Sequence, residues 1–157
     1  MLLLIKLAVV FIVSFILSIQ DLKDRRISWW IIVLGDLIFI CLQLFDYGLL
    51  NGKLEASFWL FPVQSFCMFL FYLLVRIISG NKLGSGDVLF GTFIGLCVKW
   101  NLLYLTLVIT VICADIYFFL IWKLKKINLQ TIKIPFIPFM SAGLISVYLL
   151  DFFVERF

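Results

Sequence analysis

The sequence predicts an all-α, polytopic membrane protein built as a bundle of about six transmembrane helices. Of its 157 residues, 65% are hydrophobic and only 14% are charged, and the mean hydropathy is +1.21. Soluble domains are about 45–50% apolar and about 25% charged, and so short a chain has too little interior to bury this much apolar surface. These observations exclude soluble enzymes, disordered chains and nucleic-acid-binding proteins.

Six apolar runs, separated by short polar or glycine-bearing segments, mark the expected helices. They lie at residues 2–20, 27–45, 56–78, 88–98, 102–122 and about 134–153. The first run lacks a charged start and a small-residue cleavage site, which favours a membrane helix over a signal peptide. The fourth is short and reaches membrane length only if it tilts or if the preceding loop enters the membrane. Because the runs use nearly the whole chain, we expect one domain over residues 1–157.

The basic residues are divided unevenly between the two ends of this expected bundle. The loops after the first, third and fifth helices hold nine of the 13 Lys and Arg residues, and the other end holds four. Six helices place both termini at the end that has four. The positive-inside rule then puts the basic end in the cytoplasm and both termini outside. We therefore expect a multi-pass protein of the cytoplasmic (inner) membrane, surrounded by the lipid bilayer.

Several catalytic chemistries lack their residues in this sequence. The chain has no His, and its four cysteines show no CxxC spacing. The chain therefore lacks the base of Ser-His-Asp and Cys-His catalysis and the ligands of a His-bound zinc site. The cysteine spacing indicates neither a zinc knuckle nor a redox pair. We expect no metal ion and no cofactor, so carboxylates are the main reactive groups that are left.

Three of the nine carboxylates, Asp21, Asp24 and Asp87, fall at the cytoplasmic ends of expected helices. Two carboxyl groups brought into contact can share one proton, because adjacent like charges cannot both ionise cheaply. The ionised member can then take a proton from water while the protonated member polarises an amide carbonyl. This aspartic-protease chemistry requires no His, Cys or metal.

Gly84, Ser85 and Gly86 precede Asp87 in the most glycine-rich stretch of the chain. Glycine permits positive φ and close approach of backbone to backbone, which would leave room for an extended peptide beside the acid. Non-helical backbone at membrane depth is tolerated where it lines a wet cavity. A plain turn between two helices would explain the same residues.

At this point the sequence resembles a known family. Residues 84–87, Gly-Ser-Gly-Asp, match the GxGD motif of intramembrane aspartic proteases. Residues 21–27 resemble the other element of type IV prepilin peptidases and archaeal preflagellin peptidases, an Asp at the end of the first helix followed by basic residues and Ile. The proline-bearing residues 134–139, with Gly143 after them, resemble the start of the family's last helix. The resemblance covers essentially the whole chain.

The resemblance implies an aspartic endopeptidase with Asp21 and Asp87 as its catalytic pair and Gly84 and Gly86 as supporting glycines. Asp24, one helical turn from Asp21, is the rival for its role. The implied partner is a pilin-like precursor (a prepilin or preflagellin), whose short basic leader is cut off at the cytoplasmic face beside its hydrophobic helix, typically after a Gly. The paired CxxC insertion of larger, bifunctional members is missing, so we expect no methyltransferase activity.

The chain departs from the family's pattern just after the basic residues of its first element. Residues 27–29 read Ile-Ser-Trp in place of Ile-Pro-Asn, which leaves the shape of this loop open. The neighbouring Lys23, Arg25 and Arg26 are secondary candidates, for contact either with lipid headgroups or with the substrate.

Asp36 and Asp115 lie inside apolar runs, where a carboxyl group is costly. They indicate a hydrogen bond to a polar neighbour or to each other, or a role in proton supply or substrate-helix binding. The competing hypothesis is a non-enzymatic small membrane transporter or assembly scaffold that uses these two residues. A third is a different GxGD protease, for example one that cuts signal-peptide remnants. The sequence leaves the precursor, its pilus, secretion, competence or flagellar role, and the oligomeric state open.

Overall fold

The computed structural model describes residues 2–24, 27–46, 56–81, 83–125 and 135–156. These residues form helices and short connections, with no strand among them, which confirms the all-α class. The six helices are α1 (Leu2–Asp24), α2 (Trp29–Leu44), α3 (Ala56–Ile78), α4 (Ser85–Cys97), α5 (Trp100–Lys125) and α6 (Ile137–Arg156).

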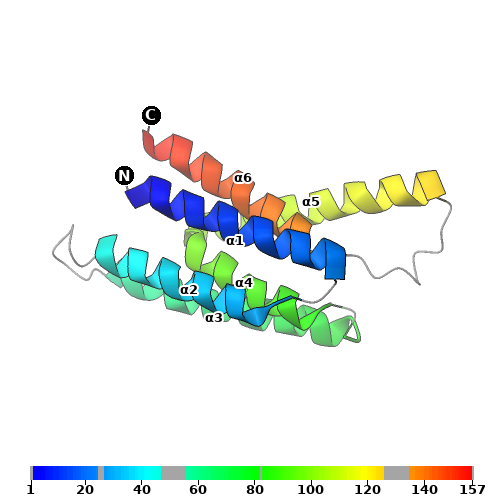
Figure 1. Cartoon of the computed structure of the whole chain (residues 1–157), viewed down its shortest axis with the longest axis horizontal. Coiled ribbons are helices and arrows are strands. Elements are labelled where there is room, and N and C mark those ends of the chain that lie inside the picture. Colours follow the sequence, from blue (N-terminus) through cyan, green and yellow to red (C-terminus); the bar gives the residue numbers. More distant parts are fainter. Residues whose placement is uncertain (1, 25–26, 47–55, 82, 126–134, 157) are drawn as a thin grey trace.

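Both termini lie at the same end of the helix bundle (Figure 1). The C-terminal end of α1 and the N-terminal ends of α4 and α6 lie together at the opposite end. Asp21 and Asp87 therefore belong to one end of the molecule, as the helix count predicts. This arrangement follows from six helices that alternate in direction along the chain.

Within the described residues, four helices are long and apolar enough to cross a membrane, over Leu2–Lys23, Leu60–Ile78, Trp100–Ile121 and Ile137–Val154. α2 and α4 are shorter, at 16 and 13 residues. With a rise of 1.5 Å per residue, α4 is about 20 Å long, which is less than the hydrocarbon thickness of about 30 Å. α4 thus depends on its neighbours, rather than on its own length, for its place in the membrane.

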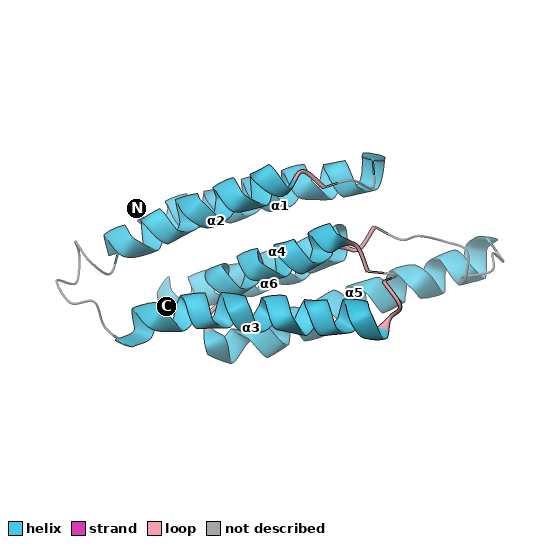
Figure 2. Ribbon diagram, turned by 90° about the horizontal axis from the view of Figure 1, so that it is seen from below, coloured by secondary structure: helices cyan, strands magenta, loops and turns pink. Residues whose placement is uncertain are grey.

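The helices form three layers, with α1 and α2 on one side, α4 and α6 in the middle, and α3 and α5 on the other side (Figure 2). α4 packs between α2 and α3, and α6 packs between α1 and α5. Nine of the 13 residues of α4 are buried as a result. Phe90, Phe93 and Ile94 of this helix are fully inaccessible to solvent. The GxGD element is therefore part of the central, most enclosed helix.

Glycines allow the two central helices to approach their outer partners closely. A Cβ atom at Gly95 of α4 would lie 2.6 Å from the Ser65 Cα and 2.8 Å from the Gln64 carbonyl oxygen of α3. A Cβ at Gly143 of α6 would lie 2.7 Å from the carbonyl oxygen of Thr106 in α5. Side chains other than hydrogen would push these helix pairs apart, so glycine at these positions sets the layer spacing.

Candidate active site

Asp21 lies in the last turn of α1 and is only 6% exposed. Its Oδ2 atom accepts a hydrogen bond of 3.1 Å from the backbone N–H of Ile137, the first residue of α6. The first N–H groups of a helix have no partner within the helix and carry partial positive charge, so they favour an ionised carboxylate. The proline-bearing segment that begins α6 thus contributes a backbone donor to Asp21.

Asp87 is the third residue of α4 and is also 6% exposed. Its Oδ2 atom accepts a hydrogen bond of 2.9 Å from the backbone N–H of Gly84, the residue before the helix. This bond is the return half of a capping box, in which the third helical residue caps the start of its own helix. The spacing from Gly84 to Asp87 therefore fixes the direction of the carboxyl group.

The glycines of this element do not adopt the positive φ values that glycine permits. Gly84 has φ −66°, and Ser85, Gly86 and Asp87 already belong to α4. The positive φ values in this region fall at Gly80 (65°) and Asn81 (61°), which end α3. The expectation of non-helical backbone up to Asp87 is wrong, because the capping hydrogen bond starts the helix two residues before Asp87.

Gly86 instead permits contact between the sequence element that contains Asp21 and the one that contains Asp87. A Cβ at this position would lie 2.2 Å from Cδ1 and 2.8 Å from Cβ of Ile27, in the connection between α1 and α2. That connection is also tied to α1, because the Ser28 N–H donates to the Gln20 Oε1 at 3.3 Å. The close approach that the glycines predict is thus present, and it joins the Asp21 element to the Asp87 element.

The carboxyl groups of Asp21 and Asp87 are close enough to interact electrostatically. Two residues of α3, Tyr72 and Arg76, also interact with Asp87. Arg76 is half-buried, and its Nε–H donates to the Asn81 Oδ1 at 3.3 Å. The site therefore combines two buried carboxyl groups with one guanidinium and one phenol. Two carboxyl groups that come into contact in such a site can hold one shared proton.

The other predicted residues of this element lie at its edge or outside the described part of the structure. Lys23 is exposed. The side chain of Asp24 and residues 25–26 lie outside the described residues. The roles considered for Asp24, Arg25 and Arg26 stay predictions.

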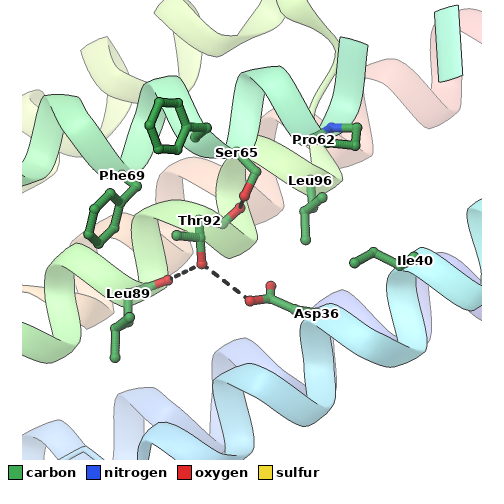
Figure 3. A pocket seen from close by; sticks show the side chains of 9 residues that line it. Asp36, Ile40, Pro62, Ser65, Phe69, Leu89, Thr92 and Leu96 are labelled. Carbon is green, nitrogen blue, oxygen red and sulfur yellow. Dashed lines mark hydrogen bonds between the residues drawn. The ribbon is translucent and has the colours of Figure 1, made fainter. Parts of the chain in front are cut away.

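Asp36 lies in a pocket of about 440 Å³ between α2, α3 and α4 (Figure 3). Its Oδ2 atom lies 3.2 Å from the hydroxyl of Thr92, which confirms a hydrogen bond to a polar neighbour. The pocket uses Leu89, Thr92 and Leu96 of α4, a face that points away from Asp87. Asp115 is exposed on α5. Neither intramembrane carboxyl group is part of the Asp21–Asp87 site.

Sequence reasoning missed the contribution of α3 to this site. Tyr72 and Arg76 are spaced by four residues and so share one face of the helix. They stand out as polar groups within the apolar run 56–78, which was the available signal. Which helix face meets which neighbour depends on lateral packing, and apolar runs do not encode it.

Comparison with known proteins gives a family match. The sequence model of the type IV leader peptidase family matches residues 8–119, which is more than two thirds of the chain. The matched region includes Asp21, Gly84, Gly86 and Asp87 and runs from α1 into α5. Neither the comparison with curated proteins nor that with solved structures gave a match.

Proposed function

The chain belongs to the type IV leader peptidase family, and from this we propose that it is a membrane-embedded aspartic endopeptidase with Asp21 and Asp87 as its catalytic pair. One observation carries the proposal: two carboxyl groups, 66 positions apart in sequence (87 − 21), are each only 6% exposed and interact at one end of the bundle. Aspartates are almost never buried to this extent unless they are paired.

In the proposed reaction the pair shares one proton, and its titration belongs to the pair rather than to either residue. The ionised carboxylate takes a proton from water as the water oxygen attacks the amide carbonyl carbon. The protonated carboxyl group gives its proton to the carbonyl oxygen. The tetrahedral intermediate, which now has two hydroxyl groups, then collapses and the C–N bond breaks. The amine leaves with the proton that the first carboxyl group took from water, and one hydroxyl of the intermediate returns its proton to the second carboxylate as the product acid forms. Both carboxyl groups return to their starting state.

The proposed substrate is a pilin-like precursor with a short basic leader followed by an apolar helix. The negative charge of the aspartates favours a basic leader, and the apolar outer helices suit a membrane-embedded substrate helix. We place the cleavage at the cytoplasmic face of the cell membrane, where the nine-to-four distribution of basic residues puts this end of the bundle. Lys23, two residues after Asp21, is exposed and suits contact with lipid headgroups.

The test is co-expression of the chain with a pilin-like precursor, comparing wild type with Asp21→Asn and with Asp87→Asn. Asparagine keeps the size of the side chain and one oxygen acceptor but cannot hold or give up the shared proton. We expect each substitution to reduce cleavage by at least about 10³-fold, since each removes one partner of an acid–base pair that acts as a unit. Precursor and mature forms are separated by electrophoresis.

Asp115→Asn is the matched control, because Asp115 is a carboxyl group on an apolar helix but is exposed and outside the site. It should cleave at the wild-type rate, and Asp24→Asn should as well. Wild-type processing by either Asp21→Asn or Asp87→Asn would show that the assignment of the pair is wrong.

A further inference from the structure

Tyr72 is a buried polar residue with no use in the proposed reaction so far. It is 3% exposed, and its hydroxyl has no hydrogen-bond partner among the described residues. Burying a hydroxyl without a hydrogen bond costs free energy, whereas phenylalanine would fill the same space without this cost. The hydroxyl therefore needs a reason other than packing.

The ring of Tyr72 lies directly beside the Asp87 face of α4. A Cβ at Gly91 would lie 2.4 Å from Cδ2 and 3.0 Å from Cε2 of the ring, so the ring rests against backbone that has no side chain. Gly91 follows Asp87 by four residues, so it lies on the same face of the helix, one turn closer to the C-terminal end. The Tyr72 side chain interacts electrostatically with Asp87.

Unlike the Tyr72 hydroxyl, the neighbouring polar groups have hydrogen-bond partners among the residues that the structure describes. Asp21 and Asp87 each already accept a backbone N–H, from Ile137 and Gly84 respectively. The Nε–H of Arg76 donates to Asn81. The phenol of Tyr72 is thus a donor beside the aspartates that no residue in the described part of the chain engages.

We propose that the Tyr72 hydroxyl donates a hydrogen bond to the carbonyl oxygen of the peptide bond that is cut. This rests on the proposed function and adds a third catalytic residue to the pair. The hydrogen bond strengthens as negative charge develops on that oxygen during attack by water, so it stabilises the transition state more than the bound substrate. The tyrosine keeps its proton throughout, and the proton transfers remain those of Asp21 and Asp87.

The deciding variant is Tyr72→Phe, which removes one oxygen atom and retains the ring against Gly91. The protein is reconstituted in lipid vesicles with a synthetic precursor that has a short basic leader, a Gly and an apolar helix of about 20 residues. We expect kcat to fall at least about tenfold with KM changed by less than about twofold. The thermal midpoint should stay the same or rise, because an unpaired buried hydroxyl has been removed.

The matched control is Tyr104→Phe, which removes the same atom from a residue that is 66% exposed on α5. Its kcat and KM should equal those of the wild type. A Tyr72→Phe variant with wild-type kcat overturns the role of the hydroxyl, and so does a loss of activity that merely follows a loss of folded protein. A wild-type protein that leaves the precursor intact overturns the proposed function itself, whereas a normal Tyr72→Phe variant leaves that function standing.

Discussion

Backbone N–H groups hold each carboxyl group of the candidate site in place. Asp21 accepts from Ile137 and Asp87 accepts from Gly84. An asparagine at either position can still accept the same hydrogen bond through its amide oxygen. The Asp→Asn variants therefore remove the acid–base function while leaving the local geometry in place. A loss of cleavage in these variants is then due to the lost proton transfer rather than to a displaced side chain.

The site also depends on Gly86, because this residue packs against Ile27. We expect Gly86→Ala to destabilise the protein by about 1–3 kcal/mol, the usual cost of forcing an extra carbon atom into a packed contact. It should also reduce cleavage, since the displaced residues link Asp21 to Asp87. Thermal unfolding and precursor processing measure the two effects.

The double variant Gly86→Ala, Ile27→Ala is the control for this explanation. It removes the Ile27 Cδ1 atom that would lie 2.2 Å from the new Cβ, though the Ile27 Cβ at 2.8 Å remains. Stability should recover in part relative to Gly86→Ala. If the double variant is as unstable as the two single variants combined, the contact with Ile27 is not the reason for glycine at position 86.

Among the helices, α4 is packed against other helices on opposite faces. Its Asp87 face meets Tyr72 of α3 through Gly91, and its opposite face contributes Thr92 to the pocket with Asp36. The Ser65 hydroxyl of α3 also donates to the Thr92 carbonyl oxygen at 3.0 Å. The position of Asp87 therefore depends on how α3 packs along the length of α4.

We expect Gly95→Ala to separate α3 from α4 and to lower the thermal midpoint by at least about 4 °C. The new Cβ would lie 2.6 Å from the Ser65 Cα and 2.8 Å from the Gln64 carbonyl oxygen, and backbone atoms cannot rotate out of the way. Thermal unfolding of the purified protein in detergent measures this shift. Cleavage should fall with it, because α3 also carries Tyr72 and Arg76.

Gly35→Ala is the matched control, on α2. The three atoms nearest to its Cβ would be side-chain atoms of Val13 and Phe93, at 3.2 to 3.3 Å. Side chains can yield by a few tenths of an ångström, so the thermal midpoint should change by less than about 2 °C. Equal losses in the two variants would contradict the idea that the α3–α4 backbone approach is what requires glycine.

At the scale of the whole molecule, the sequence predicts well at which end of the bundle a residue lies. It predicts less well which residues of other helices that residue contacts. The third apolar run, 56–78, coincides with α3, and counting helices places Asp21 and Asp87 at one end. The contacts of Tyr72 with Gly91, of Ile27 with Gly86 and of Asp21 with the Ile137 N–H could not be predicted in this way. They depend on the lateral order of the helices, which arises from side-chain packing between segments far apart in the sequence.

The orientation of the whole bundle in the membrane is open to a labelling experiment. Lys23, at the end with the aspartate pair, and Asn101, at the start of α5, are both exposed. Each is replaced by cysteine in a chain whose four native cysteines are changed to alanine. From the nine-to-four distribution of Lys and Arg, a membrane-impermeant maleimide should label the Asn101→Cys variant in intact cells. It should label Lys23→Cys only after the membrane is permeabilised.

The reverse labelling pattern would contradict more than the orientation. Asp21 lies two residues before Lys23 in α1, so a label that reaches Lys23→Cys from outside would place the aspartate pair outside as well. The basic leader of a newly made precursor lies in the cytoplasm, held there by the same charge rule that orients this chain. An outward-facing pair would never meet that leader, so proposed substrate and orientation stand or fall together, whereas aspartic peptidase chemistry as such would survive.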